Sequence, residues 1–303
     1  RRPNKPPTVG TQVYNAIART GTGAVATVTG VGFAPDLVAT MNRSGVAGNG
    51  FSWFDRLRGP LLRITSKDST IEGSPAGTLT SFGMDGVSVG ADGPEYINSS
   101  RESSIINHFF KRAPGVFDVV CYTGTGVAKT EAHGLGVVPE LMIVKARNST
   151  ANWPVNIGTT TGYLELNTTQ QSGTAASYWN STTPTSSVFS LGNSSVTNGS
   201  AVTYVAYLFA TKAGISKVGS YTGTATALSI DCGFTTGARF VLIKRTDSTG
   251  DWYVWDTVRG IIAGNDPYLL LNSTAAEVTS TDYIDAYTPG FELSSTAPAA
   301  INA

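Results

Sequence analysis

The chain has 303 residues, with 21 Lys and Arg against 21 Asp and Glu, and only 14% of it is charged. A neutral balance argues against a nucleic-acid binder, because phosphate contacts need a basic excess or a basic face. No apolar run reaches the roughly 18 residues of a membrane-spanning helix, so we expect no membrane insertion. The 34 glycines and the scarcity of charge favour a β protein with many tight turns over a helical enzyme.

The first predicted element is an extended, proline-rich N-terminal segment, residues 1–10. Its basic residues, Arg1, Arg2 and Lys5, are followed by prolines and not by the apolar core of a signal peptide. Two interpretations stay open for this segment. It is either a linker or fragment edge, or an arm that docks on a partner.

Similar stretches of sequence then recur at an offset of 99 residues. Three pairs match at this offset without a gap: 122–125 with 221–224, 141–145 with 240–244, and 148–153 with 247–252. A more diverged copy precedes them, in which residues 33–37 answer 137–141 and Trp53 lies 100 residues before Trp153. We therefore predict three tandem β repeats, at 11–114, 115–214 and 215–303.

Within each repeat, short apolar runs between Gly, Asn and Ser turns predict strands, at 117–122, 141–144, 240–243 and 252–255. The best helical candidate, residues 274–277, is one turn at most. The fold class is therefore all-β, with antiparallel β-sandwich-like repeats of roughly 100 residues. A repeat of this size can bury its own core, so we expect the repeats to follow one another like beads on a string.

The third repeat lacks its closing strand. Apolar strands are expected at 104–110 in the first repeat and 202–209 in the second, whereas the third repeat stops before that position. Either the sequence is a piece of a longer protein, which we favour, or another chain supplies the strand. An open apolar edge left alone would invite aggregation.

The repeat argues against a shared catalytic base. His133, Cys232 and Val31 fall at one position, and a position that accepts all three is one for packing or a turn. His108 aligns with Tyr207 on the closing strand, so we expect a packed ring with a polar edge. The sequence carries no nucleophile elbow, zinc-protease or phosphate-loop motif, and we expect no catalytic residues, metal or cofactor.

Carboxylate pairs are the remaining candidates for hydrolysis of a glycan. Asp251 with Asp256, or Asp282 with Asp285, could supply an acid and a base. However, Asp251 aligns with Asn152, so the second repeat would lack such a site. We therefore expect that the protein is not an enzyme.

Tryptophan and arginine residues are the candidates for contacts. Trp53, Trp153 and Trp252 recur, which indicates core or hairpin anchors, with a sugar-stacking platform as the alternative. Trp179 and Trp255 do not recur and are better candidates for exposed contacts. Arg58 and Arg259 follow an aspartate at the same spacing, Asp55 and Asp256, and either brace a turn or lie at an interface.

Several stretches together resemble a repeat found in tail and other virion structural proteins of tailed bacteriophages. They cover residues 117–126, 133–136, 139–145, 204–209, 219–223 and 240–252. The resemblance is strongest over 115–303. The first copy departs from it at residues 40–50, where the Lys or Arg and the polar turn are replaced.

This resemblance implies a structural component of a bacteriophage virion, in the tail rather than the capsid. The function implied is that of a tail fibre, spike or tail-tip protein that contributes to host attachment. Its partners would be other phage virion proteins, further copies of itself with a trimer favoured, and a host surface glycan or protein. The alternatives are a capsid decoration or head-fibre protein and, second, a carbohydrate-binding module or glycan depolymerase.

Overall fold

The apolar runs singled out in the sequence form strands. They are β9 (Phe117–Thr123), β11 (Leu141–Ala146), β18 (Phe240–Lys244) and β19 (Trp252–Asp256). The computed structural model describes residues 5–44, 50–75, 77–91, 97–100 and 104–303. Within these residues the helices α1 (Ala176–Trp179) and α2 (Ser195–Asn198) are single turns, and none forms at 274–277. The all-β fold class is confirmed.

The first lobe, residues 11–114, contains two antiparallel sheets. Its inner sheet has the order β1-β8-β3-β4-β5, and its outer sheet has the order β2-β7-β6. The elements are a 3-10 helix (Gly10–Gln12), β1 (Tyr14–Arg19), β2 (Ala26–Thr29), β3 (Leu37–Asn42), β4 (Ser52–Asp55), β5 (Ile64–Thr65), β6 (Leu79–Phe82), β7 (Gly86–Val89) and β8 (Ile105–Phe110). Val38 and Phe109 of the inner sheet pack against Val28 and Val87 of the outer sheet. The lobe is thus a small sandwich.

The second lobe, residues 115–214, repeats this arrangement. Its inner sheet has the order β14-β13-β12-β11-β16-β9, and β10 pairs with β15 in the outer sheet. The further strands are β10 (Lys129–Ala132), β12 (Pro154–Asn156), β13 (Gly162–Glu165), β14 (Gly173–Thr174), β15 (Val188–Leu191) and β16 (Thr203–Phe209). Its own core lies between these sheets and includes Met142, Phe189 and Leu208.

The third lobe, residues 215–303, has a narrower inner sheet. The order of that sheet is β18-β19-β20, and the outer sheet has the order β17-β22-β21. The further strands are β17 (Leu228–Asp231), β20 (Leu269–Leu270), β21 (Ile284–Tyr287) and β22 (Gly290–Leu293). Val241 and Trp255 pack with Ile284 and Leu293 in the core of this lobe.

Strand pairing places corresponding residues of the three inner sheets in register. Each lobe has a chain of three paired residues: Ala39, Trp53 and Ile64; Ile143, Val155 and Leu164; Leu242, Val254 and Leu269. Trp53 therefore corresponds to Val155 and Val254. The sequence alignment of Trp53 with Trp153 is wrong by two residues, and Phe51 holds that position. Backbone hydrogen bonds to the carbonyls of Phe51, Trp153 and Trp252 support the correction.

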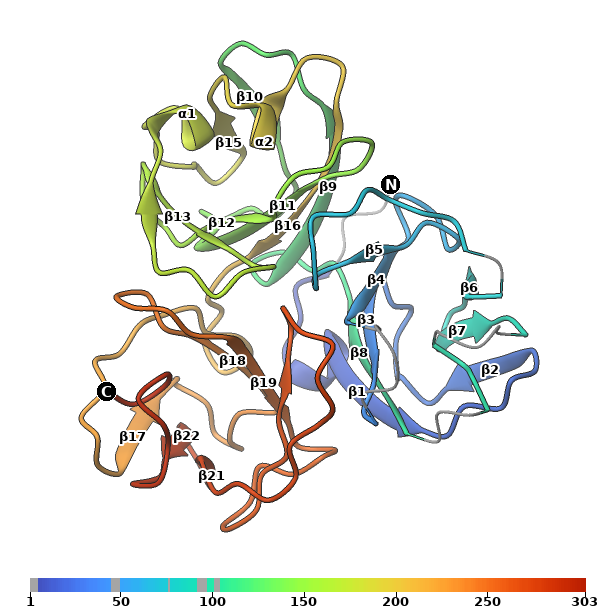
Figure 1. Cartoon of the computed structure of the whole chain (residues 1–303), viewed down its shortest axis with the longest axis vertical. Coiled ribbons are helices and arrows are strands. Elements are labelled where there is room, and N and C mark those ends of the chain that lie inside the picture. The colour runs from blue at the N-terminus through green and yellow to red at the C-terminus, as the bar shows by residue number, and fades with distance from the viewer. Residues whose placement is uncertain (1–4, 45–49, 76, 92–96, 101–103) are drawn as a thin grey trace.

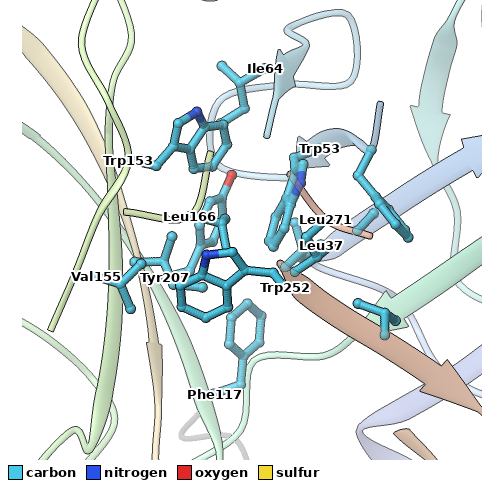
Figure 2. Packing of buried hydrophobic residues seen from close by; sticks show 14 of the residues in the cluster. Leu37, Trp53, Ile64, Phe117, Trp153, Val155, Leu166, Tyr207, Trp252 and Leu271 are labelled. Carbon is cyan, nitrogen blue, oxygen red and sulfur yellow. The ribbon is translucent and has the colours of Figure 1, made fainter. Parts of the chain in front are cut away.

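The three lobes surround a common centre (Figure 1). The inner faces of all three inner sheets contribute to one central core, which contains Trp53, Trp153 and Trp252 together with Ile64 and Leu271 (Figure 2). The expectation of beads on a string is therefore wrong. Each sheet buries its second face against the other lobes, because a lobe of two thin sheets leaves an apolar face uncovered.

The described part of the proline-rich segment, residues 5–9, has no regular secondary structure. Pro7 is buried, whereas Lys5 and Pro6 are exposed. Arg1 and Arg2 lie outside the described residues. So does the tip of the first hairpin, residues 45–49, where the first copy departs from the virion repeat.

Candidate functional site

The recurring tryptophans join the lobes to one another. Trp153 of the second lobe donates its indole Nε1–H to the Asp68 carbonyl of the first lobe at 3.2 Å. Trp252 of the third lobe donates to the Glu165 carbonyl of the second lobe at 3.0 Å. Trp53 and Trp153 lie with ring centroids 5.7 Å apart. All three indoles are buried, so a sugar-stacking platform made of these residues is excluded.

A network of charged residues fills the junction between the first and second lobes. Arg58 Nε donates to Asp55, and its Nη1 donates to Glu72 Oε2 at 2.8 Å. Arg147 of the second lobe makes two hydrogen bonds to Glu72, at 3.0 and 2.9 Å. Tyr207 of the closing strand β16 donates to Asp55 Oδ2 at 2.9 Å. Burial opposes the charge of Glu72, but the hydrogen bonds from Arg147 and Arg58 lower its pKa.

The junction between the third and first lobes has the same design. Arg259 Nε donates to Asp256 Oδ2 at 2.5 Å, and its Nη1 donates to Glu277 Oε1 at 3.2 Å. Arg43 of the first lobe makes a forked pair with Glu277, with contacts of 2.6 to 2.9 Å. His108 of the closing strand β8 stands in the place of Tyr207, with Nε2 3.7 Å from Asp256 Oδ2.

Arg58 and Arg259 are therefore not contact residues on the surface. Both guanidinium groups are fully buried, and each braces the turn that follows its aspartate. Asp55 Oδ1 accepts the amide N–H of Arg58, and Asp256 Oδ1 accepts that of Arg259, both at 2.9 Å. Each arginine also lies at an interface, but one between lobes of a single chain.

The junction between the second and third lobes is built from uncharged residues at the corresponding positions. The backbone contact is the same: Glu72 donates to the Arg147 carbonyl, Glu277 to Arg43, and Ser172 to Thr246. Ser172 and Thr246 thus replace the ion pairs of the other two junctions. Ile157 replaces Asp55 and Asp256, because it follows Asn156, which pairs with Met142.

Trp179 and Trp255 are not exposed contacts either. Their relative exposures are 1% and 0%, because each lies between the two sheets of its lobe. Trp179 Nε1 donates to the Gly162 carbonyl at 3.1 Å. His133 is half-buried in a turn, where Nδ1 accepts the Leu135 amide and Nε2 lies 3.1 Å from the Thr185 carbonyl. This geometry supports a turn position and not a shared base.

The carboxylates of the first proposed pair, Asp251 and Asp256, have structural partners. Asp256 is held by Arg259, and Asp251 accepts a hydrogen bond from Asn272 at 2.8 Å. Burial raises the pKa of Asp285, and the neighbouring Asp282 adds to that shift. Among the described residues, no group of three or more His, Cys, Asp or Glu is placed to hold a metal ion.

Three asparagines form a clamp that holds the loop just before the position of the closing strand. This role was not predicted from the sequence. Asn98, Asn198 and Asn302 each accept the amide of a threonine, Thr22, Thr125 or Thr224, and each donates two hydrogen bonds to backbone carbonyls. Their spacings of 100 and 104 residues are close to the repeat length. That spacing was the available signal, but asparagine is common in this chain.

One edge of β18 differs from its counterparts in the other two lobes. In the first two lobes the corresponding strands, β3 and β11, pair on this edge with β8 and β16. Within the described residues no strand pairs with this edge of β18. Residues 216–222, which correspond to β9, have only the isolated bridge between Lys212 and Ser216. The sequence stops at Ala303, before the position at which this closing strand begins in the other two lobes.

Backbone alternation shows which groups lie on this edge. Arg147 donates its amide to Thr203 at the start of β16, so Leu141, Ile143 and Lys145 also direct their amides toward that strand. Their counterparts in β18 are Phe240, Leu242 and Lys244. The amide and carbonyl groups of these three residues therefore point outward from this edge.

The side chains along this edge are also less covered than their counterparts. Ile143 and Lys145 are buried beside β16, with exposures of 1% and 0%. Leu242 and Lys244 are only half-buried. Partial burial lowers the pKa of Lys244 to about 8. Among the described residues no strand covers this edge, and its side chains are less covered than their counterparts.

The fold and its junctions define a class of all-β protein, three small sandwiches closed around a shared core. The chain belongs to the DUF7483 family, described as a domain of unknown function, whose profile matches residues 10–303. No curated protein and no solved structure matches the chain. No helix among the described residues has both the length and the apolar character needed to cross a membrane.

Proposed function

We propose that the protein is a structural component of a tailed-bacteriophage virion. Its role there is that of a tail fibre, spike or tail-tip protein that contributes to host attachment. Two observations support the proposal. One is the resemblance of residues 115–303 to the repeat of virion proteins, and the other is the architecture of three β sandwiches around one shared core.

The fold carries the structural part of the argument. Three small β sandwiches pack around one central core, and ion pairs join the first lobe to the other two. A β unit of this kind suits a structural part of an assembly. The proposed partners are other virion proteins, further copies of the chain with a trimer favoured, and a host surface glycan or protein.

Locating the chain in the particle tests this function. Purified virions would be labelled with an antibody against the 303-residue chain and imaged by electron microscopy. We expect label at the tail. Label on the head would replace the tail assignment with that of a decoration or head-fibre protein, and a particle that contains none of the chain would contradict the virion role.

A further inference from the structure

We propose that the junction between the third and first lobes opens in acid, because it is held closed by His108 in its neutral form. The inference goes beyond the proposed function and does not depend on it. His108 belongs to β8 of the first lobe and has an exposure of only 1%. Its position in the sheet is that of Tyr207 in the second lobe, because His108 pairs with Ala39 as Tyr207 pairs with Ile143.

Two lobes together enclose the imidazole of His108. In the first lobe, the Tyr14 hydroxyl lies 3.0 Å from Nδ1, and the centroid of the Phe51 ring lies 5.9 Å from that of the imidazole. From the third lobe, the Phe240 ring meets the imidazole edge-on at 5.3 Å, and Asp256 Oδ2 lies 3.7 Å from Nε2. Separation of these two lobes would therefore expose the ring to water.

The contacts of the ring suit a neutral imidazole and not a charged one. Nδ1 can accept the Tyr14 hydroxyl, which leaves the ring proton on Nε2, facing the carboxylate of Asp256. At 3.7 Å the contact with Asp256 is too long for a hydrogen bond, and among the described residues Nε2 has no other partner. A second proton would have to enter at Nδ1, where it would end the donation from Tyr14.

The charges around the ring do not compensate for its burial. Asp256 attracts a second proton, but Asp256 is already paired with Arg259, whose positive charge opposes that proton. Arg239 of the third lobe adds another positive charge, over the ring of Tyr14. Burial is the largest effect, and the balance lowers the pKa of His108 to about 4. An exposed ring has a pKa near 6.5, so the open form binds the proton more tightly and acid favours opening between these values.

The junction between the first and second lobes provides a control within the same molecule. Each of the two junctions contains one aspartate, one glutamate and two arginines, so the effect of acid on carboxylates is common to both. They differ at the closing strand, where Tyr207 donates its hydroxyl to Asp55 but His108 does not reach Asp256. Burial raises the pKa of Tyr207 even further from the acid range. Only the junction that contains His108 should therefore open in acid.

Backbone amides that cross the lobe boundaries report the opening of each junction. The hydrogen-bonded pairs, with the amide first, are Glu277 with Arg43, Glu72 with Arg147, and Ser172 with Thr246. Hydrogen exchange of these three amides would be measured on the 303-residue chain at pH 7 and pH 5 and divided by the intrinsic rate at each pH. We expect the protection of the Glu277 amide to fall about twentyfold, as pKa values of 6.5 and 4 require, and that of Glu72 and Ser172 to stay nearly constant.

Exchanging the two closing-strand residues tests whether His108 is the cause. His108→Tyr gives the junction the residue that the first and second lobes use, and we expect the acid response of the Glu277 amide to disappear. Tyr207→His makes the reciprocal change, and we expect the Glu72 amide to acquire that response. Circular dichroism at pH 7 shows whether each variant folds, and either folded variant decides the question alone.

Four results would overturn the proposal. They are no acid response of the Glu277 amide in the unaltered chain, an equal response of all three amides, a response of Glu277 that survives His108→Tyr, and a Glu72 amide that stays insensitive in Tyr207→His. The first two are read on the unaltered chain, so the proposal stays testable even where a variant does not fold.

Discussion

At the scale of single residues, His108 shows how burial between lobes changes chemistry. Its ring stacks beside Tyr14 of β1, whose hydroxyl lies 3.0 Å from Nδ1, and Asp256 and Arg259 lie on the other side. Burial is the largest effect and lowers the pKa of His108 to about 4, although Asp256 acts in the opposite direction. The neutral ring is therefore the form that the fold stabilises.

This pKa makes a testable contribution to stability. The unfolded chain binds a proton at His108 near pH 6.5, whereas the folded chain binds it only near pH 4, so acidification between these values favours unfolding. The shift corresponds to about 3 kcal/mol. We expect His108→Gln to remove this loss. The free energy of unfolding, measured by urea titration between pH 4 and 7, checks it.

The pH dependence of the free energy of unfolding must be compared between variants, because more than one group contributes to it. Burial raises the pKa of Asp266 to about 7, which contributes with the opposite sign in the same range. The matched control is His133→Gln, which replaces the other histidine of the chain and so shows what the same substitution does at a half-buried turn. If His108→Gln kept the full pH dependence of the unaltered chain, the assignment to His108 would be wrong.

The sequence identified part of this chemistry. It aligned His108 with Tyr207 and associated Arg58 with Asp55, because corresponding residues of a repeat recur at equal spacing. It gave no indication of Glu72 or Glu277, which complete both networks from loops of unequal length. It also assigned Trp179 and Trp255 to exposed contacts, since sequence alone does not show which faces another element covers.

At the scale of secondary-structure elements, the asparagine clamp fixes where a closing strand begins. Asn198 accepts the Thr125 amide at 2.9 Å and donates to the carbonyls of Val127 and Gly192 at 2.7 and 2.6 Å. It is completely buried, so water does not replace these bonds when the side chain is removed.

We expect Asn198→Ala to lower the free energy of unfolding by about 3 kcal/mol, because it leaves buried backbone groups unpaired. Asn193→Ala, in the same loop but exposed, should change it by less than about 0.5 kcal/mol. Thermal and urea unfolding of both variants measure the difference. Equal losses in the two variants would mean that the clamp is not what holds this loop.

Strands were the most predictable elements, because each one is encoded by a local run of β-branched and aromatic residues between turns. The register in which the strands pair was harder to predict. The sequence aligns Trp53 with Trp153, because tryptophan is conspicuous. The pairing of Trp53 with Ala39 shows instead that Trp53 corresponds to Val155, two residues after Trp153. Register depends on hairpin length, and the first hairpin differs in length from the other two.

At the scale of the whole molecule, the central core makes the lobes depend on one another. Trp153 contacts Trp53 and the Asp68 carbonyl of the first lobe, whereas Trp179 contacts residues of its own lobe. Both indoles are buried, and truncation of either should cost about 3 to 5 kcal/mol. The two residues therefore differ in location and not in burial.

We expect Trp153→Ala to speed hydrogen exchange in β4 and β5 of the first lobe as well as in the second lobe. Trp179→Ala should have its main effect on β10 and β15, in the outer sheet of the second lobe. Exchange measured by mass spectrometry of proteolytic fragments separates these patterns. An effect of Trp153→Ala that stopped at the boundary of the second lobe would contradict a shared core.

The sequence could not have predicted this arrangement. A segment of roughly 100 residues is long enough to fold alone, and its apolar pattern is satisfied equally by a private core or a shared one. The distinguishing information lies in pairs far apart in the chain, such as Arg43 with Glu277. No local pattern reports such a pair.

Differential scanning calorimetry of the 303-residue chain tests the shared core most directly. If the lobes unfold together, the calorimetric enthalpy, about 210 kcal/mol for a chain of this length, should equal the van't Hoff enthalpy of one transition. Lobes that unfold independently would give a van't Hoff enthalpy near one third of that value, or separate transitions. The account predicts a ratio of the two enthalpies close to one, and a ratio near three would contradict it.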